Sequence, residues 1–120
     1  MYTPIRQDTG VAYDESLAAE VRMRLPKPHL EEKRLFGGLA FMLNGKMCVT
    51  VNSRPDHVMM VRVARGCQDE ALKREGAKLA VMRGREMPGW IFLTEEAIGT
   101  AQDLDYWIEL ALNFQTRLTA

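Results

Sequence analysis

The segment that most constrains the fold is residues 33–51, where an Asn-Gly pair separates two runs of alternating apolar side chains. The first run covers residues 39–43 and the second covers residues 47–51. Asn44-Gly45 favours a type I′ turn, because this turn needs positive φ at both central positions. Both runs are apolar on both faces of a strand, which is typical of central strands. The sequence therefore predicts an antiparallel hairpin in the middle of a sheet.

Two glycines, Gly37 and Gly38, come directly before the first arm of this hairpin. Glycine inside a strand pattern marks a bulge, a sharp bend or a place where two backbones approach closely. We expect one of these features at Gly37-Gly38.

The remaining segments predict three helices and further short strands. The first helix begins at Asp14, a suitable N-cap, and ends before Pro26. Helical patterns follow at about 67–75 and 103–118, strand patterns at 57–63, 78–82 and 90–93, a short strand at the end of 29–34, and a Gly- and Pro-containing connection at 83–89. The predicted fold class is α+β: a single domain with an antiparallel sheet of about five strands and helices packed on it, in the order α-β-β-β-α-β-β-α.

Residues 1–12 are polar and contain Pro4 and Gly10, so we expect a flexible N-terminal arm followed by one α+β domain at 13–120. The net charge is zero and the pI is about 6.7, so the whole molecule has no field that favours nucleic acid or an anionic membrane. The sequence shows neither a transmembrane run nor a signal-peptide pattern. A cytoplasmic location and no membrane partner are expected.

The two cysteines, Cys48 and Cys67, do not make a disulfide framework. Cys48 falls in a predicted central strand, where a free thiol acts as a small apolar side chain. A metal site built from these cysteines with His29 and His57 would need four distant positions to converge without a short ligand pair. We therefore expect no metal and no cofactor.

The common catalytic motifs are absent: the sequence has no G-x-S-x-G, no H-E-x-x-H, no phosphate loop and no G-x-G-x-x-G. His57 follows a turn cluster and begins a strand, which we interpret as a solvated position rather than a catalytic one. No acid–base pair or nucleophile stands out. The sequence therefore favours a non-enzymatic protein and predicts no catalytic residue.

Arg83-Gly84-Arg85 is the strongest candidate for a binding site. Two fork-shaped guanidinium groups around a glycine suit a phosphate or a carboxylate, and Gly37-Gly38 is expected nearby. The competing interpretation is a polar turn between two strands, whose arginines pair with acids of the last helix.

Charge is segregated along the second half of the chain. Residues 62–85 contain seven Lys or Arg and three acids, whereas residues 86–116 contain six acids and neither Lys nor Arg. A basic segment can contact nucleic acid, but no nucleic-acid motif accompanies this one. We favour mutual neutralisation of the two segments on one surface and keep direct nucleic-acid binding as the weaker alternative.

Three motifs in order resemble the N-terminal domain of the TfoX/Sxy family: Y-D-E-S-L at Tyr13–Leu17, L-F-G-G-L-A-F at Leu35–Phe41 and M-R-G-R-E-M-P-G-W at Met82–Trp90. The resemblance covers residues 13–118 and implies the α+β fold with an antiparallel sheet. It also implies structural roles, as turn glycines, packed aromatics or a buried arginine, for Phe36, Gly37, Gly38, Arg83, Gly84, Arg85, Gly89 and Trp90. The family is named for regulators of DNA uptake competence that carry a second, C-terminal helical domain, which a sequence ending at Ala120 is expected to lack.

The functional hypothesis is a small non-enzymatic interaction module, linked to transcriptional regulation through contacts with an unidentified protein partner. Self-association into a homodimer, through a sheet edge or the apolar stripe of the last helix, is compatible with it. The alternative is a small anion- or ligand-binding domain that uses Arg83 and Arg85, with Gly37, Gly38 and Gly84 beside them.

Overall fold

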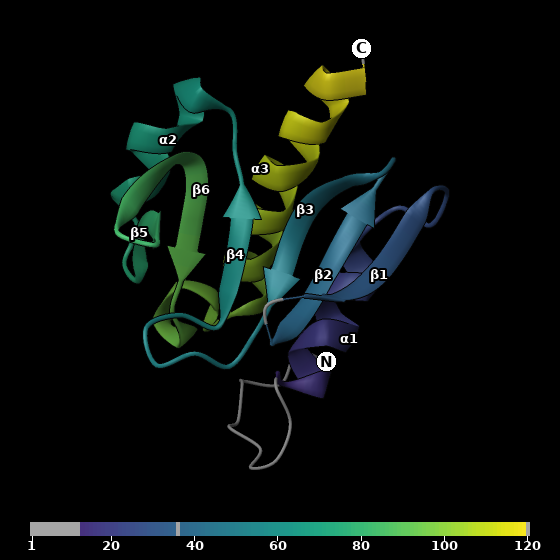
Figure 1. The fold of residues 1–120 in the computed structure, drawn as a ribbon, viewed down its shortest axis with the longest axis horizontal. Helices are drawn as coiled ribbons and strands as arrows, with labels where there is room; N and C mark the ends of the chain where they lie inside the picture. The colour runs from purple at the N-terminus through teal and green to yellow at the C-terminus, as the bar shows by residue number, and fades with distance from the viewer. Residues whose placement is uncertain (1–12, 36, 120) are drawn as a thin grey trace.

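The computed structural model describes residues 13–35 and 37–119, which form one antiparallel sheet with helices (Figure 1). In chain order the elements are α1 (Glu15–Arg24), β1 (Leu30–Leu35), β2 (Gly38–Leu43), β3 (Lys46–Val51), β4 (Met59–Arg62), α2 (Arg65–Leu72), β5 (Ala77–Met82), β6 (Arg85–Leu93), the short 3₁₀ helix η1 (Glu95–Ile98) and α3 (Ala101–Thr119). The strand order is β1-β2-β3-β4-β6-β5, so β1 and β5 form the edges. The predicted α+β class is confirmed. The N-terminal arm predicted at 1–12 and Phe36 lie outside the described residues.

The described residues contain six strands, where the sequence predicted about five. The first strand, predicted only as a short one at the end of 29–34, is the longer β1, which pairs with β2 along its whole length, from Leu30↔Leu43 to Leu35↔Gly38. Residues 31–35 of β1 are exposed, and four of these five are charged. Charged side chains are typical of an edge strand, because they discourage pairing with other chains. This composition lacks the apolar alternation by which strands are predicted.

The β2–β3 hairpin has the predicted turn. Asn44 and Gly45 have φ angles of 54° and 79°, the two positive values that a type I′ turn requires. The register between β2 and β3 shifts part-way along the hairpin, and Cys48 is the extra residue. As a result, Cys48 and Val49 both reach the same apolar core.

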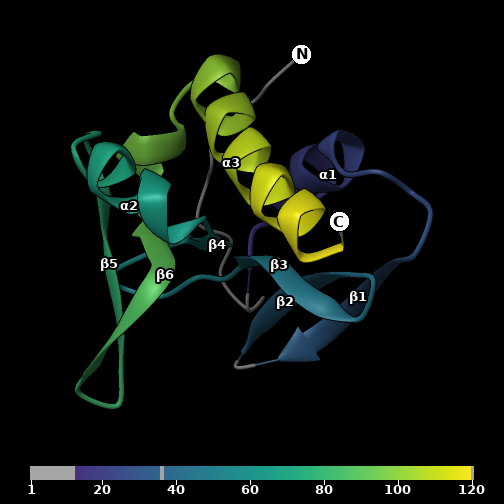
Figure 2. The same ribbon diagram turned by 90° about the horizontal axis from the view of Figure 1, so that it is seen from above.

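All three helices pack on the same face of the sheet, which we call the covered face (Figure 2). The first helix, α1, begins at the N-cap Asp14, whose carboxylate accepts hydrogen bonds from the backbone N–H groups of Ser16 and Leu17 at 2.7 and 3.2 Å. The stripe predicted on α3 is buried against the sheet. At its centre Trp107 is fully buried, and its indole N–H donates to the Ala97 carbonyl at 3.1 Å.

The connection predicted at 83–89 is wrong, because a two-residue turn, Arg83-Gly84, joins β5 directly to β6. Pro88 and Gly89 lie inside β6, in the stretch where its register with β5 shifts. Gly89 has a φ of 90°, and its N–H donates to Gln68 Oε1 at 2.6 Å. Strands tolerate Pro and Gly at such irregularities, so residues that predict a loop occur here in a bulged strand.

The opposite face of the sheet carries none of the described helices, and we call it the open face. A small buried cluster of Met60, Ala80 and Phe92 lies on it, with Trp90 packed half-buried against the cluster. The β5–β6 hairpin projects from the sheet on this side (Figure 2). The open face is therefore hollowed, and the candidate site lies there.

Candidate functional site

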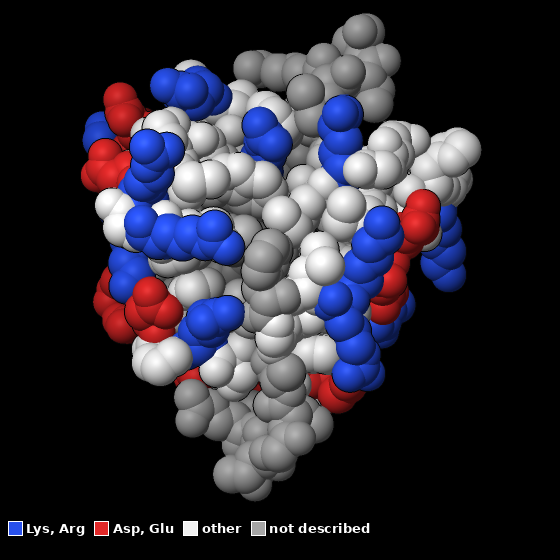
Figure 3. Space-filling model, in the orientation of Figure 1, with Lys and Arg blue, Asp and Glu red and all other residues white. Residues whose placement is uncertain are grey.

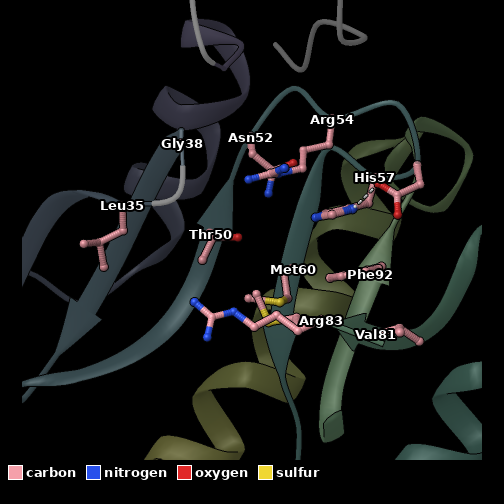
Figure 4. A pocket seen from close by; sticks show the side chains of 12 residues that line it. Leu35, Gly38, Thr50, Asn52, Arg54, His57, Met60, Val81, Arg83 and Phe92 are labelled. Atoms are coloured by element: carbon pink, nitrogen blue, oxygen red, sulfur yellow. Dashed lines mark hydrogen bonds and ion pairs between the residues drawn. The ribbon is translucent and has the colours of Figure 1, made fainter. Parts of the chain in front are cut away.

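A pocket of about 500 Å³ lies on the open face, in front of the central strands (Figure 4). This volume is within the usual range for small-molecule sites. The residues that line it are Leu35, Gly38, Thr50, Asn52, Arg54, Asp56, His57, Met60, Val81, Met82, Arg83 and Phe92. They come from strands β1 to β6 and from the loop before β4, so the pocket exists only after the whole sheet has formed.

The floor of the pocket is apolar. Met60 of β4 is the register partner of Phe92 of β6, and both side chains are buried. The imidazole of His57 stacks on the Phe92 ring, with the ring centroids 3.6 Å apart and the planes at 4°. These three side chains give the pocket a floor that suits an apolar group.

Two buried oxygen atoms in the pocket have no hydrogen-bond partner: Oγ1 of Thr50 and Oδ1 of Asn52. The two residues are only 6% and 8% exposed. An unpaired buried polar group costs about 1–3 kcal/mol, so native proteins keep few of them. In Figure 4 the hydroxyl of Thr50 points from β3 into the pocket. The free hydrogen-bonding capacity therefore faces the space where a ligand would lie.

His57 and Asp56 form a hydrogen-bonded pair at the edge of the pocket, with His57 Nδ1 2.8 Å from Asp56 Oδ1. Burial lowers the pKa of His57, and the Asp56 carboxylate offsets this only in part. Burial raises the pKa of Asp56, but the hydrogen bond and charge of His57 outweigh it and hold that pKa below its usual value. This pattern fits a neutral imidazole whose Nδ1–H donates to a carboxylate. The other ring nitrogen, Nε2, points away from Asp56 into the pocket (Figure 4).

The sequence-based interpretation of His57 as a solvated residue is wrong, since it is 7% exposed. The backbone N–H of Val58 donates to the Leu93 carbonyl at 2.9 Å, which holds the start of β4 beside the end of β6. This long-range pairing places the imidazole over Phe92. The turn cluster before His57 gives no sign of it.

Arg83 reaches the pocket from the β5–β6 turn. Arg83 and Gly84 have φ angles of 54° and 74°, the same positive pair as Asn44 and Gly45. Left-handed backbone costs about 1–2 kcal/mol for most residues, and Asn tolerates it better than Arg. In Figure 4 the Arg83 side chain extends across the pocket from the hairpin. Backbone strain of this kind concentrates at functional sites.

The structure brings together two of the five residues predicted to bind a ligand. Arg83 and Gly38 line the pocket, whereas Gly37, Gly84 and Arg85 do not. Gly37 and Gly84 are turn glycines with φ angles of 76° and 74°. At Gly38, an added Cβ would lie 2.5 Å from the Val51 carbonyl oxygen. The Gly-Gly pair therefore combines a turn with a close backbone approach, two of the features expected from the sequence.

The competing interpretation is right about the turn, since Arg83-Gly84 joins β5 to β6, but wrong about the pairing of the arginines with acids of the last helix. The acids at the start of α3 pair elsewhere, Asp103 with Arg74 at 3.2 Å and Asp105 with Arg24 at 2.6 Å. Within the described part of the chain neither Arg83 nor Arg85 makes an ion pair. The guanidinium of Arg83 is thus not neutralised by a neighbouring carboxylate.

Sequence reasoning missed Thr50, Asn52 and Asp56 as site residues. One signal was present, because Thr50 is the polar exception in an otherwise apolar strand. Asn52 and Asp56 belong to a turn cluster that is typical of a solvated loop. Only the folded sheet shows that this loop forms one end of a pocket.

Other kinds of site find less support. Among residues 13–35 and 37–119, no group of three or more His, Cys, Asp or Glu side chains is placed to hold a metal ion. Cys48 is free and buried, as predicted, and burial raises its pKa to about 12, so it is unreactive at neutral pH. None of the helices in the described ranges is long and apolar enough to cross a membrane.

The charge around the pocket is mainly positive. Figure 3 shows Lys and Arg side chains on both sides of the open face, with Asp and Glu side chains toward its margins, and the charged residues that line the pocket are Arg54, Arg83 and Asp56. Cations that flank a hollow, mostly apolar surface attract anions toward it.

Residues 25–115 match the family model described as the TfoX N-terminal domain. The chain belongs to the TfoX N-terminal domain family. The match includes all six strands, so the pocket lies within the TfoX N-terminal domain itself. The resemblance based on three motifs is thereby confirmed. The chain has no match among curated proteins or among solved structures.

Proposed function

We propose that this TfoX N-terminal domain is a small non-enzymatic regulatory module that binds a small organic anion in its open-face pocket. The observation that carries the proposal is the position of Arg83. This residue accepts positive φ, lacks an ion-pair partner among the described residues and lines a pocket with two unpartnered buried oxygens. A fork-shaped guanidinium suits a carboxylate or phosphate, and the floor of Met60 and Phe92 suits an apolar body.

A binding role fits the polar groups better than a catalytic one. The hydroxyl of Thr50 has no hydrogen-bond partner, so His57 does not activate it as a nucleophile. His57 is instead held by Asp56 and by its stack on Phe92. These contacts fix the imidazole as part of the wall.

Protein contact through the same face is a second candidate function, in line with the expected interaction module. Leu35 and Val81 line the pocket, and they are 38% and 49% exposed. Exposed apolar side chains at a hollow are typical of a surface that a partner covers. In the regulatory module that we propose, a bound ligand would change the surface of the open face that the protein partner contacts.

Direct nucleic-acid binding through the basic segment remains the weaker alternative. It requires an affinity that falls steeply as salt increases. An oligonucleotide titration at low and moderate salt distinguishes it from pocket binding, since a salt-independent or absent affinity would exclude it.

The test of the proposal uses two fluorescent probes, anilinonaphthalene sulfonate and its neutral analogue phenylnaphthylamine, which lacks the sulfonate. We expect the wild-type domain to bind the sulfonate probe more tightly. Arg83→Asn should weaken binding of the sulfonate probe about tenfold and leave the neutral probe unchanged, because a charge-assisted contact contributes about 1.5–3 kcal/mol.

Arg85→Asn is the matched control, since Arg85 is outside the pocket lining. Asn suits the positive φ at position 83, so the first variant keeps the turn. Equal losses in the two variants, or no binding of the sulfonate probe by the wild type, would contradict the proposal.

A further inference from the structure

We infer that the pocket selects a bipolar ligand, with an anionic group at Arg83 and an N–H or O–H donor at the Asn52–His57 end, joined by an apolar body. This inference rests on the proposed function and specifies its ligand. It follows from three groups of contacts along the pocket.

The Asn52–His57 end presents hydrogen-bond acceptors. The amide oxygen of Asn52 is buried and unpartnered. Because Nδ1 of His57 is engaged with Asp56, its Nε2 carries the lone pair of a neutral ring. Arg54 also lines this end but has an interaction of its own. A ligand group here must therefore donate a hydrogen bond.

The opposite end presents a donor cation. The guanidinium of Arg83 carries only N–H groups, and it lacks a carboxylate partner among the described residues. The charge-assisted pair that it would form with a carboxylate or phosphate is stronger than a neutral hydrogen bond. The anionic part of the ligand belongs at this end.

The middle of the pocket is apolar. The parallel stack of His57 on Phe92 and the side chain of Met60 form its surface. The hydroxyl of Thr50 can donate or accept, so it places no restriction on ligand polarity. Since the buried oxygen of Asn52 needs a hydrogen-bond donor, a simple inorganic anion bound at Arg83 leaves that oxygen unpaired.

The test uses three small probes of similar shape. Indoleacetate has a carboxylate and a ring N–H, benzofuranacetate replaces the N–H by oxygen, and skatole lacks the carboxylate. Affinities are measured by chemical-shift titration of the ¹⁵N-labelled domain. We expect wild-type affinity to fall about tenfold when either the N–H or the carboxylate is removed, because the first loss leaves the buried Asn52 oxygen unpaired and the second removes a charge-assisted contact with Arg83.

Two variants show which end of the pocket contacts the N–H and which end contacts the carboxylate. In Asn52→Leu, which has nearly the same shape, the indole and benzofuran probes should bind within twofold of each other. In Arg83→Asn, indoleacetate and skatole should bind within twofold of each other. The ¹⁵N spectrum verifies that each variant is folded, and Arg85→Asn, which changes an arginine outside the pocket lining, is the control that should keep both preferences.

The pH dependence gives an independent readout. As the pH is lowered from 8 toward the reduced pKa of His57, the protonated fraction of the imidazole rises and Nε2 turns from acceptor into donor, so indoleacetate should lose affinity more than benzofuranacetate does. The charged groups that act on His57 are Asp56 and Arg54 of its own loop and Lys78 of β5. A pH profile that is identical for both probes would contradict the assignment of the donor end.

The outcomes separate this inference from the proposed function. A preference for the carboxylate without a preference for the N–H would overturn the bipolar ligand and leave the anion pocket standing. Failure of all three probes, while the sulfonate probe binds through Arg83, has the same meaning. Failure of every probe would overturn both.

Discussion

The two faces of the sheet use buried side chains in opposite ways. On the covered face, buried apolar side chains from three helices and the strands fill one core, and the indole N–H of Trp107 has its partner in the Ala97 carbonyl. On the open face, Thr50 and Asn52 are equally buried, yet each has an oxygen without a partner. The Trp107 N–H on the covered face is therefore satisfied within the chain, whereas the oxygens of Thr50 and Asn52 on the open face are available to the ligand that we propose.

The two tight turns show the same contrast within one backbone geometry. Asn44-Gly45 and Arg83-Gly84 are both two-residue turns with positive φ at both positions. Asn is a residue that such a turn favours, and the Asn44-Gly45 turn connects the two central strands β2 and β3. Arg is a poor choice for the backbone, but it lies at the pocket. The positive φ of Arg83 lowers the stability of the turn. In the function that we propose, the contact between its guanidinium and a ligand offsets this loss.

The largest effect is expected on the covered face. Trp107→Ala should lower the free energy of unfolding by about 3–5 kcal/mol, because it leaves a large cavity and an unpaired Ala97 carbonyl. Urea denaturation followed by circular dichroism measures this. Val81→Ala on the open face is the control and should change stability by less than about 0.5 kcal/mol. Similar losses in both variants would remove the contrast between the faces.

The second effect concerns the glycine pair at the border of the pocket. Gly38→Ala should cost about 1–3 kcal/mol, because the new Cβ would meet the Val51 carbonyl oxygen. Gly37→Ala meets no atom within 4 Å and should lose only the backbone term of about 1 kcal/mol. The melting temperatures of the two variants show which substitution lowers stability more. A larger loss at Gly37 would refute the close-approach argument.

A substitution on the open face should stabilise the protein. Thr50→Val removes a buried hydroxyl without a partner, so we expect a gain of about 1 kcal/mol in the free energy of unfolding. Denaturant titration gives the sign directly. A loss of stability would mean that the hydroxyl is already satisfied, and the open face would then resemble the covered one.

Exchanging the first residues of the two turns, Arg83 and Asn44, should change the free energy of unfolding by a smaller amount and in opposite directions. Arg83→Asn should stabilise the domain by about 0.5–1 kcal/mol, and Asn44→Arg should destabilise it by a similar amount, because both positions have positive φ. Melting temperatures of the two single variants and their combination test this. If Arg83→Asn destabilises the protein, the arginine is a structural residue.

The smallest expected effect is on the pH dependence of stability. Burial lowers the pKa of His57 in the folded state, whereas the unfolded chain keeps a value of about 6.5. As pH falls below that value, the unfolded state takes up the proton first, so the wild type loses stability. His57→Phe keeps an aromatic ring over Phe92 and should lose less between pH 7.5 and 5. Parallel slopes for both proteins would show that His57 is not buried as described.

Local sequence determined the parts of this protein that depend on neighbouring residues. The Asn44-Gly45 pair specified the β2–β3 turn, and Asp14 specified the N-terminus of α1. The apolar stripe around Trp107 specified which side of α3 is buried. These features could be predicted because backbone preferences and periodicity act over a few residues. The α+β class followed from their order. The full length of the charged β1 and the bulged start of β6 were missed, since these stretches become strands only through their pairing partners.

The candidate site was decided by the tertiary structure. Arg83 was recognised in the sequence, but its partners in the pocket, Thr50, Asn52 and His57, lie about thirty residues earlier in the chain. Pairing of β4 with β6 brings His57 over Phe92, and the projecting β5–β6 hairpin brings Arg83 to the same hollow. Burial without a partner is a property of a position in the folded sheet. The sequence contains the residue types, and long-range strand pairing determines which of them face one another.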